Sequence, residues 1–221
     1  MSQQTVENIE INYPGFGKIC LAEGYAVHKS WYQRAEKETK QWWCNNIKSD
    51  WNILDIGANV GMYSALFSKL ATKGKIFCFE PTPTIKILEK NLNNLNAKNC
   101  VIYDVAVGDK TGIIQEKLQM IWKRKVLEKQ FTFTTIDQFC GTIGEKINAI
   151  KIDIDGFDPE ALYGAQKILK EQSPVVIVEL NPTALSYRGH TPRQAVEFMK
   201  SQNYPLLKVM DGENYLFRKS V

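Results

Sequence analysis

Residues 53–64, with the sequence ILDIGANVGMYS, place an acid and two glycines at the end of an apolar run. Asp55 closes the run, Gly57 and Gly61 follow with G-x-x-x-G spacing, and Glu80 lies 19 residues beyond Gly61. Glycines let the backbone approach a ligand closely. An acid at the end of the next strand can accept hydrogen bonds from both hydroxyls of a ribose. The pattern therefore predicts a site for an adenosine-containing ligand at the carboxyl edge of a parallel sheet.

The spacing distinguishes this site from a dinucleotide site. Dinucleotide fingerprints use G-x-G-x-x-G, which rests a diphosphate on a helix N-terminus. Here Asp55 faces the turn, where it would repel phosphate and accept hydrogen bonds from an ammonium group, and Ala58 and Asn59 keep the turn small. These features fit S-adenosylmethionine, and the alternative is an ordinary tight turn between a strand and a helix.

Four further segments extend the pattern: VAVGDKTG at 105–112, TTIDQF at 134–139, KIDIDGFDPEALYGA at 151–165 and VVIVELNP at 175–182. With them, the chain resembles the FkbM family of class I S-adenosylmethionine-dependent methyltransferases over roughly residues 50–205. Asp155 and Asp158 stand where that family usually has Glu, which keeps the charge and shortens the reach by one methylene. The resemblance implies methyl transfer, and it implies cofactor contacts from Asp55, Gly57, Ala58, Asn59, Gly61, Glu80, Pro81, Ala106 and Asp153.

The order of elements agrees with an α/β fold. Apolar, β-branched runs predict strands at 52–56, 75–80, 100–106, 147–153, 174–180, 205–210 and 214–218. Helical faces lie between them, including one that runs from Ala161 to Leu169. Asp158 before Pro159 and Thr191 before Pro192 read as helix starts, the second with Gln194 completing a capping box.

The last two strands are expected to form a hairpin around Asp211-Gly212. The resemblance implies a Rossmann-like, doubly wound, mostly parallel sheet of seven strands with this antiparallel hairpin at its C-terminal end. We expect an N-terminal helical or cap segment at 1–50 and the methyltransferase domain at 51–221.

Acids also close the fourth and fifth predicted strands of the domain. Asp153 follows one strand, and Glu179 and Asn181 follow the next, so all three are expected at one edge of the sheet. Three oxygen ligands of this kind could hold Mg²⁺, which would lower the pKa of an acceptor hydroxyl. In the alternative, Asp153 contacts the cofactor and Glu179 orients the substrate directly.

The chain has two histidines, and His190 is the better candidate for a general base. It lies in SYRGHTPR, downstream of the fifth strand, where Tyr187 and Arg188 could line a substrate pocket. Arg188 would suit a carboxylate or a phosphate. The alternative for His190 is a simple exposed loop residue.

Two segments are candidates for substrate contact. Residues 28–46 read as a helix carrying Trp31, Tyr32, Trp42 and Trp43. The family resemblance implies that such a helix covers the cofactor or substrate side, and the alternative is packing in the core. Residues 112–133 carry five basic and two acidic residues: Lys117, Lys123, Arg124, Lys125, Lys129, Glu116 and Glu128. Beside Trp122 they could meet an anionic substrate, and a solvated charged face is the alternative.

Composition indicates one enzyme-sized domain, since 221 residues with 44% hydrophobic residues can bury a full core. The five cysteines show no C-x-x-C pair, which argues against a zinc site or a disulfide framework. No apolar run is long enough to cross a membrane. We therefore expect a soluble, cytoplasmic protein with no membrane partner, and the pattern makes no prediction about oligomeric state.

Three functions are compatible with these residues. The FkbM resemblance implies O-methylation of a hydroxyl on a sugar, glycan or other small natural product. The second hypothesis is 2′-O-methylation of RNA ribose, with nucleic acid as the partner and with Lys29 and Lys167 joining Asp153 and Glu179. The third is a non-catalytic module that binds S-adenosylmethionine.

Overall fold

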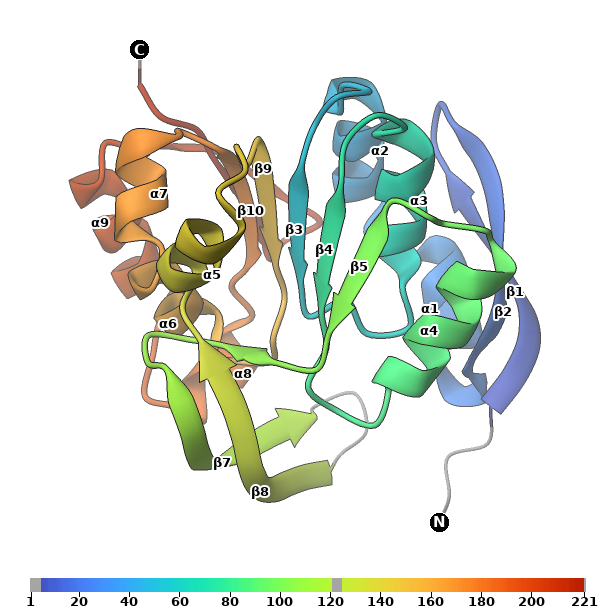
Figure 1. Ribbon diagram of the computed structural model, residues 1–221, viewed down its shortest axis with the longest axis horizontal. Coiled ribbons are helices and arrows are strands. Elements are labelled where there is room, and N and C mark those ends of the chain that lie inside the picture. Colours follow the sequence, from blue (N-terminus) through green and yellow to red (C-terminus); the bar gives the residue numbers. More distant parts are fainter. Residues whose placement is uncertain (1–4, 121–124, 221) are drawn as a thin grey trace. The chain divides into compact units, whose positions relative to one another are not determined.

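The computed structural model describes residues 5–120 and 125–220 (Figure 1). The chain divides into two compact units, residues 1–103 and 104–221, so the division falls inside the expected 51–221 domain. Trp122, Lys123 and Arg124 of the basic segment lie outside the described residues. Within the described ranges, no helix is both long and apolar enough to cross a bilayer.

The first unit begins with a β-hairpin and continues into strand-helix repeats. Its elements are β1 (Thr5–Tyr13), β2 (Gly17–Tyr25), η1 (Ala26–His28), α1 (Lys29–Arg34), α2 (Lys37–Asn46), β3 (Ile53–Ile56), α3 (Met62–Leu70), β4 (Ile76–Phe79), α4 (Ile85–Asn94) and β5 (Cys100–Tyr103). Strands β3, β4 and β5 pair in parallel, and every residue of β3 and β4 is buried. Near-continuous apolar runs are typical of strands that are covered on both faces.

The N-terminal segment differs from the helical cap that the sequence suggested. Residues 5–25 form the antiparallel pair β1–β2, in which Ile9, Ile11 and Tyr13 alternate with polar residues and are buried. The expected helix at 28–46 is interrupted, because Glu36 adopts a left-handed conformation (φ 54°) between α1 and α2. Trp43 is fully buried and its ring packs 4.8 Å from that of Phe67 on α3, which supports a core role for this aromatic residue.

The second unit carries a three-stranded sheet, further strand-helix repeats and the C-terminal hairpin. Its elements are β6 (Ala106–Val107), β7 (Gly112–Met120), β8 (Lys125–Thr134), α5 (Ile136–Ile143), β9 (Ala149–Ile152), α6 (Asp158–Tyr163), α7 (Gln166–Glu171), β10 (Val175–Glu179), α8 (Pro182–Ser186), α9 (Pro192–Ser201), β11 (Leu206–Met210) and β12 (Asn214–Phe217). Strands β9 and β10 are parallel, whereas β12 pairs antiparallel with both β10 and β11.

The expected fold class is confirmed. The mostly parallel sheet has seven strands in the order β11-β12-β10-β9-β3-β4-β5. The expected hairpin is also present, and Asp211 (φ 50°) and Gly212 (φ 86°) form its turn. All seven expected strands occur within a few residues of their predicted bounds.

The single helix expected between Asp158 and Leu169 is instead two helices, α6 and α7. Gly164 lies at the break, where an added Cβ would overlap the carbonyl oxygen of Gly108. Its own carbonyl accepts a hydrogen bond from Asp137 N, and the Asp137 carboxylate then accepts the backbone N–H groups of Lys167 and Ile168 at the start of α7. A distant side chain thus begins a new helix where the periodicity alone predicted continuity.

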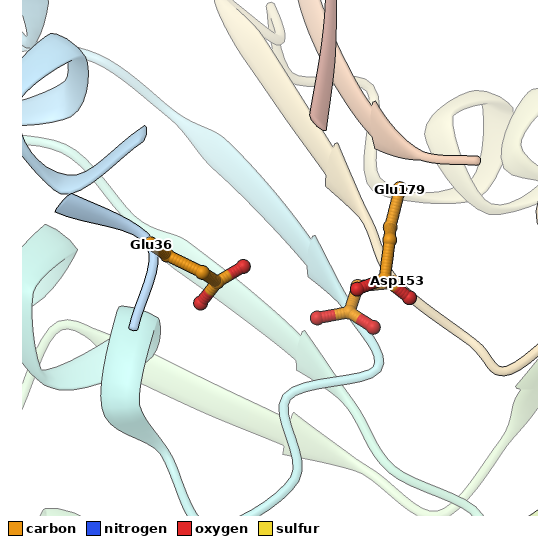
Figure 2. Close-up of side chains that lie close together, drawn as sticks. All are labelled: Glu36, Asp153 and Glu179. Atoms are coloured by element: carbon orange, nitrogen blue, oxygen red, sulfur yellow. The ribbon is translucent and has the colours of Figure 1, made fainter. Parts of the chain in front are cut away.

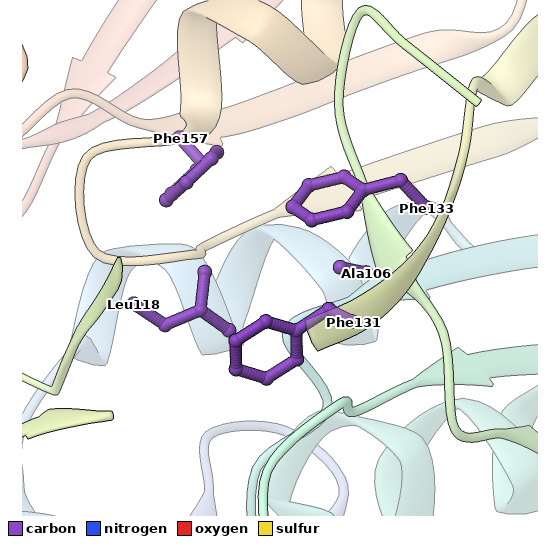
Figure 3. Close-up of a cluster of buried hydrophobic side chains, with 5 residues drawn as sticks. All are labelled: Ala106, Leu118, Phe131, Phe133 and Phe157. Carbon is purple, nitrogen blue, oxygen red and sulfur yellow. The ribbon is translucent and has the colours of Figure 1, made fainter. Parts of the chain in front are cut away.

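The hairpin of β7 and β8 rests on a hydrophobic cluster of its own unit. These two strands are long and curved (Figure 1). Figure 3 shows Leu118, Phe131 and Phe133 of this hairpin meeting Ala106 of β6 and Phe157 of the segment before α6. The basic segment 112–133 is therefore an ordered sheet over its described residues, and it packs against Phe157 in the region that follows β9.

Candidate functional site

The loop after β3 is fixed by the end of β4. The backbone N–H groups of Gly57 and Ala58 both donate to the carbonyl oxygen of Phe79, at 3.0 and 2.9 Å. Gly57 and Gly61 adopt positive φ angles of 83° and 91°, and an added Cβ on Gly61 would lie 2.9 Å from a Leu88 methyl carbon. Both glycines are therefore required by backbone conformation, and Gly61 also by packing.

Glu80 connects the two strand ends of this site. Its carboxylate accepts the backbone N–H of Asn59 at 3.0 Å and that of Thr82 at 3.0 Å, one on each oxygen. Each carboxylate oxygen has two lone pairs. Glu80 can therefore hold the loop and still accept hydrogen bonds from ribose hydroxyls.

The loop also suits the methionine end of the expected cofactor. Asp55 is fully buried, and its Oδ2 accepts a hydrogen bond of 2.5 Å from Ser64 Oγ on α3. The side-chain oxygen of Asn59 is buried without a hydrogen-bond partner in the described part of the chain. Buried polar atoms normally have partners. A donor from a bound ligand would satisfy this oxygen, so these residues fit S-adenosylmethionine.

Two residues expected to contact the cofactor, Pro81 and Ala106, do not belong to the hydrogen-bonded loop around Gly57 and Gly61. One residue that does support this loop, Ser64, was not predicted from the sequence. Pro81 is half-buried after Glu80, whereas Ala106 is buried in the hydrophobic cluster of the second unit. Ser64 was not singled out, although it ends the same twelve-residue motif. Its position one turn into α3 is the signal that could have identified it.

The second unit brings Asp153 and Glu179 together (Figure 2). Ile152 pairs with Val178, so the two acids follow at the same level of neighbouring parallel strands. Each offers a carboxylate oxygen within 4.8 Å of the other. Lys151 Nζ lies 2.9 Å from Asp153 Oδ2, and its side chain is only 3% exposed. The figure also draws Glu36, which lies at the start of α2 in the first unit.

Asn181 has a structural role instead of facing these acids as a ligand. Its side-chain oxygen accepts the backbone N–H groups of Thr183 and Ala184 and thereby caps α8. Its Nδ2 donates to Glu213 at 2.6 Å. Both ends of the amide are therefore engaged, and Asn181 does not fit the expected set of metal ligands.

The loop between β9 and α6 is closed by Asp158. Its carboxylate accepts the backbone N–H groups of Ile154 and Gly156, each at 2.9 Å. The expected helix start is confirmed, because α6 begins at Asp158 and Phe157 is its cap residue. The Asp158 side chain turns back into the loop, where Asp155 and Gly156 both have positive φ angles (49° and 101°). The Asp158 carboxylate thus closes the turn after Asp153.

Gly156→Ala is expected to destabilise the chain by at least about 2 kcal/mol, since a left-handed backbone strains a residue with a Cβ. The added Cβ would also lie 2.6 Å from the carbonyl oxygen of Ala184. The matched control is Gly141→Ala in α5. An added Cβ there would have no atom within 4 Å apart from its chain neighbours and the backbone of its own helix. Alanine is therefore expected to stabilise this helix by about 0.5–1 kcal/mol. Urea unfolding of both variants checks this, and equal stabilities would contradict it.

The stability of the chain is expected to depend on pH through Asp158. Burial raises the pKa of Asp158 from 3.8 to about 7, with a further contribution from the charge of Asp153, although the N–H group of Ile154 opposes the shift. Between these pH values the folded chain holds a proton that the unfolded chain has lost. The raised pKa of Asp158 therefore affects the free energy of unfolding. Its contribution is fully present below about pH 4 and is lost as the pH rises to about 7, a loss of up to about 4 kcal/mol.

Urea unfolding at about pH 4.5 and about pH 7.5 measures this loss. Asp158→Asn, which does not titrate, is expected to show a smaller fall in stability over the same window than the unsubstituted chain. Identical falls in the two proteins would contradict the assignment.

His190 lies in a second polar cluster. Glu160 on α6 accepts a hydrogen bond from Arg188 Nε at 2.7 Å, and the same oxygen lies 3.1 Å from His190 Nε2. Arg188 also lies 3.6 Å from Glu116 on β7, so its guanidinium already has acidic partners within the protein. Tyr187 is exposed. In the described part of the chain, no hydrogen bond or ion pair links His190 to Asp153.

The lysines considered for RNA chemistry lie on helices of different units. Lys167 is exposed on α7, and its backbone N–H donates a hydrogen bond to the Asp137 carboxylate. Lys29 begins α1 in the first unit. On the hairpin, Lys117 lies 3.4 Å from Glu128, and Lys129 lies over the ring of Phe131. Two of the described basic groups of segment 112–133 therefore have partners within that segment.

Comparison with known proteins points to one family. The family model described as the methyltransferase FkbM domain matches residues 55–206, which is more than half of the chain. The 2-O-methyltransferase NoeI of Sinorhizobium fredii (strain NBRC 101917 / NGR234) is 26% identical over 175 residues, covering 67% of this chain and 70% of that protein.

Solved structures show the same fold. The methyltransferase FkbM from Methylobacillus flagellatus KT has a TM-score of 0.56 at 15% identity over 78% of this chain, which spans only 44% of that protein. SMU.1697c from Streptococcus mutans, in complex with SAH, has a TM-score of 0.55 at 14% identity, covering 85% of this chain and 99% of that one. From the family match and the motif geometry together, the chain belongs to the FkbM methyltransferase family and is an S-adenosylmethionine-dependent methyltransferase.

Proposed function

We propose that this enzyme transfers the methyl group of S-adenosylmethionine to a hydroxyl of a sugar, a glycan or another small natural product. The observation that carries the proposal is the pair of Asp153 and Glu179, whose carboxylate oxygens approach within 4.8 Å at neighbouring strand ends. Carboxylates in this position can accept hydrogen bonds from neighbouring hydroxyls and so orient one of them. The similarity to NoeI, named as a 2-O-methyltransferase, supports the same class of acceptor.

The residues of the chain have distinct tasks in this proposal. When bound, S-adenosylmethionine supplies an electrophilic methyl group. Asp55, Glu80 and the loop from Gly57 to Gly61 hold the cofactor, and Asp153 and Glu179 align the acceptor. His190 accepts the hydroxyl proton, because a neutral imidazole has a basic nitrogen that can act as a general base.

Transfer from radiolabelled S-adenosylmethionine to a panel of monosaccharides, oligosaccharides and RNA transcripts tests the proposal. We expect label in a sugar or small-molecule acceptor, with mass spectrometry placing the methyl group on oxygen. Label in RNA ribose, with binding that weakens steeply as salt increases, would replace this function by the RNA alternative. A methyl group on nitrogen or carbon would contradict O-transfer.

The same assay tests whether Mg²⁺ binds at Asp153 and Glu179. Asp153 and Glu179 have the oxygen donors that Mg²⁺ prefers, and a bound ion would lower the pKa of the acceptor hydroxyl. Asn181 does not complete the set, because its amide is used in the cap of α8. Loss of turnover with a chelator and recovery with Mg²⁺ would assign the ion to these acids, whereas unchanged turnover would leave them a direct role with the acceptor.

We also place the proposed reaction in the cytoplasm. The five cysteines are free, and free thiols persist in reducing compartments. Fractionation of cells that produce the native protein checks this location.

A further inference from the structure

Glu160 is the centre of a charged cluster that lies outside the strand-end acids. Its side chain is 11% exposed and projects from α6 toward the segment between α8 and α9. A single oxygen, Oε1, accepts the hydrogen bond of Arg188 Nε at 2.7 Å and lies 3.1 Å from His190 Nε2. The histidine is 20% exposed. Glu160 thus contacts the ring of the proposed general base while it is itself shielded from solvent.

Arg188 is held in place from three directions. Besides Glu160, its guanidinium lies 3.6 Å from Glu116 Oε2 on β7. The guanidinium carbon lies 3.5 Å from the ring centroid of Phe157, which belongs to the hydrophobic cluster of Figure 3. Cation–π and ion-pair contacts together limit the movement of this side chain. Arg188 therefore restrains Glu160, and Glu160 restrains His190.

The geometry also determines which nitrogen of His190 carries the proton. A lone pair on Nε2 would face the lone pairs of Glu160 Oε1 at 3.1 Å, so the neutral ring carries its hydrogen on Nε2. The basic lone pair is then on Nδ1, which has no hydrogen-bond partner in the described part of the chain. Tyr163 also faces the ring, and its ring centroid lies 6.3 Å from that of His190.

We propose that Glu160 is a positioning residue that holds His190 as the Nε2–H tautomer and so makes Nδ1 the atom that receives the acceptor proton. This step rests on the proposed O-methyl transfer. The acceptor oxygen forms a bond to the methyl carbon, the electron pair of the broken carbon–sulfur bond stays on sulfur, and the O–H proton moves to His190 Nδ1. The resulting imidazolium faces Glu160 and later returns the proton to water.

Long-range proton–nitrogen NMR spectra of the full ¹⁵N-labelled chain, at a pH where the imidazoles are neutral, test the tautomer directly. The chain has two histidines, and His28→Gln assigns their signals. We expect His190 to be predominantly the Nε2–H tautomer. An Nδ1–H tautomer in the unsubstituted chain would overturn the proposal.

Two variants isolate the role of Glu160. Arg188→Met keeps Glu160 and is expected to keep the tautomer. The double variant Glu160→Met/Arg188→Met removes both charges, which avoids leaving a partly buried arginine without its closest acidic partner. It is expected to give mixed tautomers and a kcat at least about 10-fold below that of Arg188→Met, with unchanged affinity for S-adenosylmethionine.

The exposed pair Arg193–Glu197 on α9 offers a matched control, Glu197→Gln, which is expected to leave both readouts unchanged. An unchanged tautomer in the double variant would overturn the role of Glu160. The NMR readout needs no acceptor. If no hydroxyl acceptor is methylated, the proposed function is wrong. The tautomer of His190 is still decided by the NMR spectra alone.

Discussion

Asp55→Ala is expected to weaken binding of S-adenosylmethionine by at least about 100-fold, because a charge-assisted hydrogen bond is worth about 1.5–3 kcal/mol and the ligand ammonium would also lose its counter-charge. Asp55 is fully buried, and Ser64 Oγ holds one of its oxygens at 2.5 Å. The Asp55 carboxylate is therefore held in one orientation before the ligand binds, and alanine provides no acceptor in its place. Isothermal titration calorimetry with S-adenosylmethionine and S-adenosylhomocysteine measures the loss.

Glu80→Ala is expected to have a comparable effect for a second reason. Glu80 fixes the backbone N–H groups of Asn59 and Thr82, so its removal loosens the loop as well as the ribose contact. The control is Glu89→Gln on the exposed side of α4, which should bind both ligands normally. If both Asp55→Ala and Glu80→Ala keep affinities within about 3-fold of the unsubstituted chain, the cofactor site is wrongly assigned.

The sequence predicted those elements that depend on residues close together in the chain. The strands β3, β4, β9 and β10 coincide with mostly apolar runs, interrupted within β3 by Asp55 and within β9 by Lys151, because both faces of a parallel sheet are buried. The capping box of Thr191 and Gln194 forms as expected, since both its hydrogen bonds join residues three positions apart. The turn at Asp211-Gly212 follows from the ease with which these residue types adopt positive φ.

Other features depend on distant contacts or were overlooked. The break between α6 and α7 requires Gly164 to meet Gly108 and Asp137, which no window of helical periodicity contains. The β1–β2 hairpin did carry a readable signal, namely the alternation of Ile9, Ile11 and Tyr13 with polar residues. Alternation of this kind is typical of a half-buried strand.

In the candidate site, too, features set by neighbouring residues were predicted and features set by distant contacts were not. The loop around Gly57 and Gly61 lies within one motif, so residue types and spacing were enough to predict its geometry. The contact of Glu160 with His190 joins residues thirty positions apart and on different elements. Glu160 has no sequence signature of its own, and only the fold shows that it faces the imidazole.

Asp153→Asn is expected to lower kcat by at least about 100-fold, because a misaligned acceptor loses most of the benefit of a fixed reacting geometry. Asparagine retains an oxygen for Lys151, whose buried ammonium lies 2.9 Å from Asp153. The fold should therefore survive while the negative charge beside Glu179 is lost. This substitution separates the chemistry from stability better than Asp153→Ala, which would remove that partner of a buried lysine and is expected to destabilise the chain.

Steady-state turnover, measured as release of S-adenosylhomocysteine, checks this effect alongside calorimetry with S-adenosylmethionine. We expect cofactor affinity to fall far less than in Asp55→Ala, since Asp55 faces the ammonium and Asp153 faces the acceptor in the proposed arrangement. Asp104→Asn, at an exposed position of the same unit, is the matched control and should turn over normally. A kcat for Asp153→Asn within about 3-fold of the unsubstituted enzyme would show that alignment does not depend on this charge. An equal loss of cofactor affinity and of kcat/KM would instead make Asp153 a cofactor-binding residue.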